Sequence, residues 1–267
     1  MSTCYRHDDR ETLIECSRCG QFICPECMVS APVGFQCVEC VNQAPKPKVR
    51  TSFGAPTNQI PVVSKYLIGI CVGAFLYTLL NGGIYYTANR FGMIPLAIAS
   101  GEWWRLLSAA FLHGSFLHIA FNMYALYWLG PQLENLLGHR RFLGLYLLAA
   151  LGGNVASYYF SDIQTVSVGA SGAIFGLLTA TIVIGRELRA DVSQLTLLLA
   201  INVGLGFFSS AIDWRAHLGG AVVGAAIAYL QTRGPKEVRL VGMIGITALL
   251  LGIALVRGQQ ILGLFGS

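Results

Sequence analysis

Charged side chains are scarce in this chain of 267 residues. They make up 12% of it, against roughly 25% in ordinary soluble domains. Hydrophobic residues make up 54%, and they come in blocks. This lack of charge excludes an ordinary soluble domain and predicts a protein embedded in a lipid bilayer. Residues 1–43 are the exception, because they are polar, rich in cysteine and without an apolar run.

Two further features limit the class of protein. The amino terminus lacks an apolar core followed by a small-residue cleavage site, so we expect no signal peptide. The net charge is +5, but the basic residues stand at the ends of apolar runs, where they orient a chain in a bilayer. We therefore expect no nucleic-acid partner.

Seven apolar runs follow a segment rich in proline and basic residues, 44–62, which we interpret as a linker. Each run is near the ~20 residues that span a hydrocarbon core. They predict an all-α polytopic membrane protein. The runs cover approximately 64–86, 114–131, 141–160, 171–187, 192–208, 215–231 and 238–256.

Lysine and arginine are distributed unevenly between the two sides that these spans define. Eleven of them fall on the side of the linker and four on the other side. The positive-inside rule then predicts a cytoplasmic amino terminus and an extracytoplasmic carboxyl terminus in a multi-pass cell-membrane protein. The four are Arg90, Arg105, Arg215 and Arg257.

Residues 1–43 contain four pairs of potential metal ligands, each with two residues between the partners. Two such pairs supply one tetrahedral zinc ion, so the four predict two structural zinc sites with no open position for chemistry. A disulfide framework is the alternative, but it needs an oxidising compartment. Spacing alone leaves open which pair joins which. The eight ligands are Cys4, His7, Cys16, Cys19, Cys24, Cys27, Cys37 and Cys40.

Ser171 and His217 each stand just inside the start of an apolar run. Ser171 lies between Gly169 and Gly172, which leave room around its hydroxyl group. A histidine titrates near neutral pH and can take the proton of a serine nucleophile. The pair predicts acyl transfer inside the membrane, without a catalytic cofactor. Asp213 is too near the membrane edge for us to give it a catalytic role.

Polar residues also stand at the start of the second run. His118 and Asn122 are four residues apart and share one helix face. With backbone N–H groups at the start of the Ser171 helix, they are suited to stabilise an oxyanion. Each alone is better explained by hydrogen bonding between packed helices, but four polar groups near the outer ends of three helices, next to a glycine-flanked serine, favour catalysis. The pattern is not the Gly-x-Ser-x-Gly elbow of soluble hydrolases, since Ala173 occupies the last position.

Glycine spacing predicts how these helices meet. Gly220 and Gly224 fall on the face of His217, and Gly172 and Gly176 are likewise four apart on the serine helix. Small residues at this spacing permit close approach of two backbones. Trp104 and Arg105, in the long connection 87–113, suit the headgroup zone of the bilayer.

Together these residues resemble the rhomboid family of intramembrane serine proteases. The matching features are Gly169-Ala-Ser171-Gly172, Ala216-His217 with Gly220 and Gly224, His113-x4-His118-x3-Asn122, and Trp104-Arg105. The resemblance implies a Ser171–His217 dyad and an oxyanion or substrate site with His113, His118, Asn122 and Gly169. It also implies transmembrane protein substrates, cut near the outer end of a span. Phe175 replaces a tyrosine of some members, and its ring can only pack on the histidine.

The resemblance also divides the chain. It implies a rhomboid-like six-helix core at 63–232 and one added transmembrane helix at 233–267. The module at 1–43 resembles a B-box zinc finger, whose cross-braced order joins Cys4 and His7 with Cys24 and Cys27, and the other four ligands with one another. A cytosolic protein is compatible as a partner of this module.

Two other functions are compatible with a chain of this composition. One is a catalytically silent relative that escorts membrane clients, although such relatives usually lack the serine or the histidine. The other is a transporter, which would predict charged residues along the spans and a repeat between halves. Neither feature is evident in the sequence, which does not identify a substrate or an oligomeric state.

Overall fold

The computed structural model describes residues 2–44, 50–57, 59–209 and 212–265. The chain separates into two compact units, residues 1–49 and 50–267. We describe each unit by itself.

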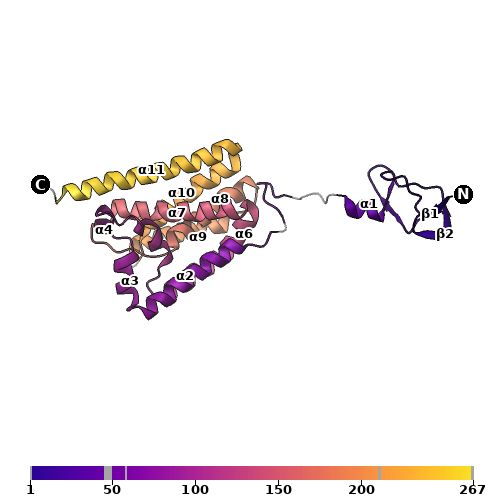
Figure 1. Cartoon of the computed structure of the whole chain (residues 1–267). Helices are drawn as coiled ribbons and strands as arrows, with labels where there is room; N and C mark the ends of the chain where they lie inside the picture. The colour runs from indigo at the N-terminus through magenta and orange to yellow at the C-terminus, as the bar shows by residue number, and fades with distance from the viewer. Residues whose placement is uncertain (1, 45–49, 58, 210–211, 266–267) are drawn as a thin grey trace. The chain divides into compact units, whose positions relative to one another are not determined.

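The smaller unit is built from two short hairpins and one helical turn (Figure 1). Strand β1 (Ser2–Cys4) pairs antiparallel with β2 (His7–Thr12), and β3 (Met28–Ser30) pairs with β4 (Phe35–Cys37). Helix α1 (Val38–Gln43) follows β4. The buried centre consists of Ile23 and six cysteines. So small a core stabilises a fold only weakly, which leaves the cysteines to supply the rest.

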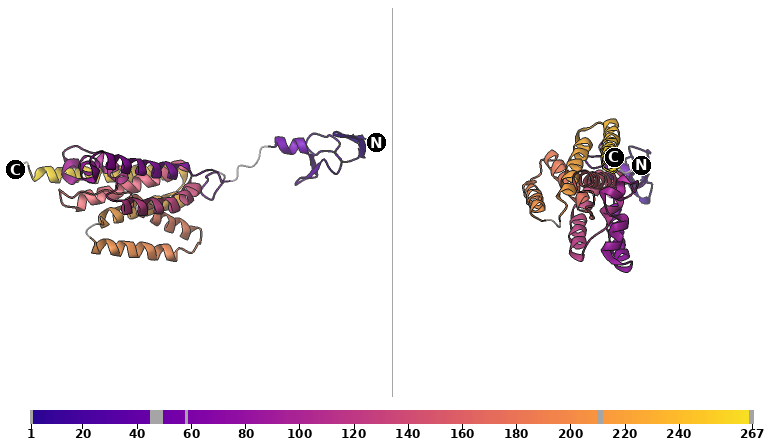
Figure 2. Two further views of the ribbon diagram at one scale, coloured as in Figure 1. Left: turned by 90° about the horizontal axis from the view of Figure 1, so that it is seen from below. Right: turned by 90° about the vertical axis from the view of Figure 1, so that its left-hand side faces the viewer.

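The larger unit is a bundle of helices (Figures 1 and 2). Its seven long helices coincide with the seven predicted apolar runs. They are α2 (Val62–Leu80), α6 (Phe116–Leu137), α7 (His139–Phe160), α8 (Ser171–Glu187), α9 (Ser193–Phe208), α10 (Trp214–Arg233) and α11 (Lys236–Gly263). Short helices fill the connection between α2 and α6, namely α3 (Gly83–Phe91), α4 (Pro95–Ala99), α5 (Arg105–Ser108) and the 3-10 turn η1 (Ala109–Phe111).

Length and composition single out only some of these helices as membrane spans. Among the described residues α2, α7 and α11 qualify, and α5–η1 with α6 would be a fourth span, bent by 93°. Helices α8 and α9, with 17 and 16 residues, are too short for a full span, and α10 contains polar and charged residues that lower its mean hydropathy. Helices in the centre of a bundle accept small and polar residues that lipid-facing helices avoid.

Helices α7, α8 and α10 form this centre. Helix α10 packs against both α7 and α8, whereas α2 packs against α6, and α11 against α7 and α4. The two outer helices α2 and α11 lie on opposite sides of the bundle in Figure 1. Helices α6, α8 and α10 all begin at the same end of the bundle, which we call the Ser171 end.

The opposite end is fastened by the buried carboxylate of Glu134. Its oxygens accept the backbone N–H groups of Val63 (2.9 Å) and Ser64 (2.8 Å), the Ser64 hydroxyl (2.6 Å), and His139 Nδ1 at 2.5 Å. Because the first N–H groups of a helix lack partners within it, a carboxylate there stabilises the start of α2. Glu134 thereby ties α6 to α2 and α7.

The described part of the predicted linker from residue 50 onward is not a free tether. Phe53 is buried in the main core. Its carbonyl accepts a hydrogen bond from Arg141 (2.5 Å), and the Thr51 hydroxyl donates to the Leu136 carbonyl (2.8 Å). Proline and basic residues predicted a linker, but its one aromatic side chain, Phe53, is buried in the core of the larger unit.

Candidate active site and metal centres

Ser171 is the first residue of α8, two residues after a glycine with positive φ. Gly169 has φ of +139°, a conformation that other residues rarely adopt. A Cβ atom added there would lie 2.8 Å from His118 Nε2 and 3.6 Å from Ser171 Oγ. Gly169 therefore keeps open the space between the serine hydroxyl and the His118 ring, which is where a reacting carbonyl oxygen would need to lie.

His217 is the fourth residue of α10 and stacks on an aromatic ring of α8. The rings of His217 and Phe175 are 4.0 Å apart at their centres and inclined by 15°. Phe175 is one turn after Ser171, so it holds the imidazole against the face of α8 that carries the serine. The expected packing role of Phe175 matches this geometry.

Glycines bring α8 and α10 into backbone contact. A Cβ atom added at Gly220 would overlap the carbonyl oxygen of Gly172, and one at Gly224 would overlap Gly176. The two predicted glycine pairs thus face each other across one interface. Since Ser171 and His217 stand at the same end of these helices, the close approach places both side chains along one pocket.

This pocket at the Ser171 end has a volume of about 560 Å³ and contains most of the predicted site. Ser171, His217, His118, Asn122 and Gly169 all line it. Within the described residues no hydrogen bond joins Ser171 to His217, and His217 Nδ1 is buried without a partner. Nucleophile–base hydrogen bonds are often long in enzymes without substrate, and they shorten when the substrate binds.

The environment of His118 indicates which of its nitrogens carries a proton. The backbone N–H of Gly114 donates to His118 Nδ1 at 3.4 Å. A neutral imidazole with Nδ1 as acceptor carries its proton on Nε2, an assignment that rests on this contact. Nε2 is the atom that lies beside Gly169. His118 therefore presents a hydrogen-bond donor to the space next to Ser171.

Asn122 and His113 lie on either side of His118. The Asn122 amide donates to the His118 carbonyl (2.8 Å) and lines the pocket, with its second N–H not used in that bond. His113 is fully buried and meets the edge of the His118 ring, with ring centres 5.2 Å apart. It does not line the pocket. The structure thus places His113 behind His118 rather than at a substrate.

Two residues of the pocket were not predicted from the sequence as parts of the site. Asn154 of α7 lines the pocket and donates to the Leu106 carbonyl at 2.9 Å. A polar residue inside an apolar run was its available signal. Asp213 caps α10 by accepting the Ala216 N–H (3.2 Å). Its other oxygen accepts the hydroxyl groups of Ser157 and Ser167.

Asp213 therefore connects three parts of the site. Ser157 belongs to α7, Ser167 lies in the loop that leads to Ser171, and Asp213 begins the helix of His217. Among the described residues its hydrogen bonds do not involve the His217 ring. Asp213 fixes the loop before Ser171 relative to the helix that carries His217.

The structure corrects the expected position of Arg105. Its side chain is 4% exposed. It donates to the carbonyls of Asn89 (2.6 Å) and Gly92 (2.9 Å) and pairs with the Glu102 carboxylate (2.7 Å from Nε). The cation is thus internal to the loop and does not reach lipid headgroups. Trp104 is 54% exposed and can lie in the interface as expected.

The eight predicted metal ligands form two separate clusters. One contains Cys4, His7, Cys24 and Cys27, and the other contains Cys16, Cys19, Cys37 and Cys40, with ligand atoms within 4.8 Å of one another in each. This is the cross-braced grouping. Nδ1 of His7 lies 3.8, 3.4 and 3.4 Å from the three sulfur atoms of its cluster. Tetrahedral zinc sets its ligands about 3.6 Å apart, so the residues fit such an ion.

Thiol acidity in these clusters also favours a cation. Burial raises the pKa of Cys4, but backbone N–H donors of Arg6 and Cys24 outweigh it and lower the pKa to about 6. Burial and the neighbouring Cys4 and Cys24 raise the pKa of Cys27 to about 11. Without a cation the thiols of one cluster cannot all ionise together, whereas a bound metal ion stabilises all of them as thiolates.

Comparison with known proteins finds one matching family model and several similar proteins. A family model described as Rhomboid domain matches residues 100–234, which contain the whole pocket. The chain is 36% identical to the rhomboid protease GluP of Bacillus subtilis over 206 residues, 73% of this chain and 40% of GluP. It is 37% identical to the putative rhomboid protease YdcA of the same organism over 143 residues, 51% of this chain and 70% of YdcA.

A third relative matches over more of its own length. The rhomboid protease AarA of Providencia stuartii is 27% identical over 231 residues, which are 74% of this chain and 80% of AarA. The chain spans less than half the length of GluP, so a shared family does not transfer the activity of that whole protein.

Proposed function

Because the chain belongs to the rhomboid family, we propose that it is an intramembrane serine endopeptidase in which Ser171 is the nucleophile and His217 the base. The observation that supports this best is the common pocket of Ser171, His217, His118 and Asn122 at the end of three helices. The substrates are transmembrane segments of other proteins, which reach the pocket within the bilayer.

The proposed reaction has two halves, formation and release of an acyl group on Ser171, and the groups of the pocket act in both. Ser171 Oγ attacks the scissile carbonyl carbon while His217 accepts its proton. The oxygen of that carbonyl becomes an oxyanion, to which His118 Nε2–H, Asn122 and the Ser171 N–H donate. As the C–N bond breaks, His217 returns the proton to the leaving amine, and water then releases the acyl group by the same steps in reverse.

We further propose that the amino terminus is cytoplasmic and that cleavage takes place near the outer leaflet. The support is the distribution of eleven basic residues against four on the two sides. In intact cells, a tag fused before Met1 should be inaccessible to an added protease, and a tag after Ser267 should be accessible. The reverse accessibility would contradict the orientation.

For the amino-terminal unit we propose two structural zinc ions. They would be held by the two clusters and would cross-link loops that bury little apolar surface. Metal analysis of the purified full chain should return about two zinc ions per chain. One ion, or iron, would contradict the assignment. A docking role toward a cytosolic protein fits a module that lies outside the matched residues 100–234.

The endopeptidase proposal is tested with a single-span substrate in liposomes. Ser171→Ala should abolish cleavage, and mass spectrometry of the products should place the cut inside the substrate span. Ser193→Ala is the matched control, because Ser193 also begins a helix, α9, but is exposed and outside the pocket. If Ser171→Ala cleaves as well as the wild type, the nucleophile is wrong. If the wild type binds the substrate without cleaving it, the chain is a silent binding relative.

A further inference from the structure

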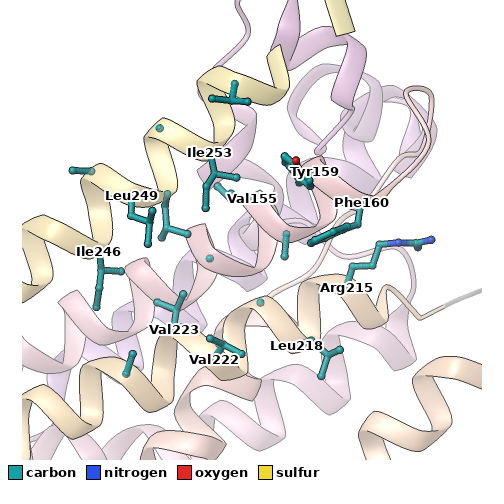
Figure 3. A pocket seen from close by; sticks show the side chains of 18 of the residues that line it. Val155, Tyr159, Phe160, Arg215, Leu218, Val222, Val223, Ile246, Leu249 and Ile253 are labelled. Atoms are coloured by element: carbon teal, nitrogen blue, oxygen red, sulfur yellow. The ribbon is translucent and has the colours of Figure 1, made fainter. Parts of the chain in front are cut away.

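A long apolar groove adjoins the pocket at the Ser171 end, with which it shares Arg215. It runs between α7, α10 and α11 and has a volume of about 1080 Å³. Side chains such as Val155, Leu218, Val222, Leu249 and Ile253 form its walls (Figure 3). Typical ligand pockets measure about 300–1,000 Å³, so the groove has room for a sizeable apolar ligand.

The length of the groove matches one leaflet of a bilayer. On α11 its lining runs from Ile246 to Val256, and on α10 from Trp214 to Ala226. At 1.5 Å per residue these stretches are about 15 and 18 Å long. The hydrocarbon core is about 30 Å thick, so the groove covers about half of it, starting at the Ser171 end where α10 begins.

Two arginines lie near the groove at that end, one in its lining and one directly after the lining residue Val256. Arg215 lines the groove, and its guanidinium lies 4.9 Å from the ring centre of Trp214. Arg257 lies 5.7 Å from the ring centre of Tyr159, another lining residue, and reaches the Ser161 carbonyl only at 3.4 Å. Figure 3 shows Arg215, Phe160 and Tyr159 gathered at the same end.

Neither arginine has a carboxylate partner in the described part of the chain. Arg257 Nε is moreover buried without any hydrogen-bond partner. A buried donor without a partner is costly, and arginine is well suited to bind a phosphate group. This end of the groove is therefore complementary to an anion, while the walls of the groove are complementary to a hydrocarbon chain.

We propose that this groove is a binding site for one anionic phospholipid. An acyl chain lies along α7, α10 and α11, and the phosphate group contacts Arg215 and Arg257. Hydrocarbon walls alone would not select a ligand, since bulk lipid tails are as apolar as the groove. Selectivity for an anionic headgroup must come from the two cations, each of which contributes about fivefold in affinity.

A transmembrane helix of another protein fits the groove less well. Such a helix spans the full hydrocarbon core of about 30 Å, whereas the groove ends about halfway across it. A helix would also have to bring its own anion to the membrane interface at the position of the arginines. A phospholipid has both the half-bilayer length and the negative charge.

The test measures lipid retained by the purified full chain, by native mass spectrometry after exchange into detergent. The probes are phosphatidylglycerol and phosphatidylcholine with identical acyl chains. We expect one phosphatidylglycerol to be retained in preference to phosphatidylcholine. Arg215→Gln and Arg257→Gln should each reduce this preference about fivefold. Arg90→Gln is the control, because Arg90 is an exposed arginine of α3 that does not line the groove.

A second pair of variants tests the groove itself. Gly252 lines the groove, and a Cβ added there meets no atom within 4 Å. Gly252→Leu should therefore fill the groove without disturbing the helix, and lipid retention should be lost. Gly73→Leu is the control, because a Cβ added at Gly73 of α2 likewise meets no atom within 4 Å, but Gly73 lies outside the groove.

Three results would overturn the proposal. The first is equal retention of both lipids by the wild type. The second is an undiminished preference in both arginine variants. The third is Gly252→Leu leaving lipid retention intact while it disrupts a protein complex, which would assign the groove to a protein helix. The readout is lipid mass, so none of these results depends on whether the chain is a protease.

Discussion

Each of the two units of this chain is stabilised internally by a different physical means. The amino-terminal unit has one fully buried aliphatic residue, Ile23, surrounded by cysteines. The membrane unit has a continuous core of aliphatic and aromatic residues, and its centre is an interface of glycines between α8 and α10. The first depends on metal ligands and the second on the close approach of backbones.

The difference also concerns distance along the chain. Each metal ligand pair lies within four consecutive residues, and both clusters lie within residues 4–40. The pocket at the Ser171 end combines residues from 114 to 217. The ligand clusters depend on local spacing, whereas the pocket depends on the packing of whole helices. Perturbing each unit should therefore have distinct consequences.

The largest expected effect is removal of metal from the full chain by a chelator. Structural zinc contributes about 10–16 kcal/mol of apparent binding free energy in small zinc-binding peptides. The amides of β1 to β4 should lose protection from hydrogen exchange, and those of α8 should keep theirs. Cys24→Ser should act like the chelator, while Cys71→Ala, a buried cysteine of α2 outside the clusters, should leave β1 to β4 protected. Protection of the strands without metal would contradict the account.

The next effect concerns the glycine interface. Gly220→Val should force α8 and α10 apart, because its Cβ would overlap the carbonyl oxygen of Gly172. We expect loss of cleavage and a decrease in the unfolding free energy of at least about 1–3 kcal/mol, as for overpacked cores. Gly245→Val is the control, since a Cβ at Gly245 of α11 meets nothing within 4 Å. Equal stability and activity of the two variants would refute the close contact.

A smaller effect is expected from the oxyanion donors. Asn122→Ala should reduce kcat on the order of a hundredfold with little change in stability, as for the loss of one such donor. Asn202→Ala is closely matched, because Asn202 of α9 makes the same bond to the carbonyl four residues before it (2.8 Å) but lies outside the pocket. An increased KM with unchanged kcat would assign Asn122 to substrate binding instead.

The smallest effect should follow from Asp213→Asn. The amide oxygen can still cap α10 in place of Oδ1. The NH2 group that replaces Oδ2 is a donor and cannot accept the hydroxyl groups of Ser157 and Ser167. We expect a loss of about 1–2 kcal/mol in the unfolding free energy and a reduced kcat, because the loop before Ser171 is less well fixed. Asp191→Asn is the control, since Asp191 is an exposed carboxylate that accepts the backbone N–H of Ser193 two residues away (2.9 Å). If both variants behave alike, Asp213 does not position the site.

The sequence predicted the helical membrane fold and the rhomboid family, and these are confirmed. The predicted ligands of the amino-terminal unit form two clusters that could hold metal ions, while the zinc itself stays a prediction. Local patterns were sufficient here, since apolar runs determine helices and Cys-x-x-Cys spacing determines ligand pairs. The residues expected at the active site are found around one pocket, apart from His113, and their catalytic roles stay predictions.

What the sequence could not show depends on tertiary packing. Arg105 has the same sequence context whether its cation meets lipid or the carbonyls of Asn89 and Gly92, and only the folded loop decides. The position of His113 behind His118 depends on a ring contact between the loop and α6. The role of Asp213 requires Ser157 and Ser167, which are 56 and 46 residues away in the chain.

The central claim is that Ser171 and His217 act on each other across the α8–α10 interface. It is tested most directly by labelling the full chain in liposomes with a serine-directed fluorophosphonate and locating the label by mass spectrometry. The account predicts that Ser171 is labelled with loss of fluoride, and that His217→Ala abolishes this labelling while the protein stays folded. Labelling of Ser171 at an unchanged rate in His217→Ala, or labelling of a different serine, would contradict it.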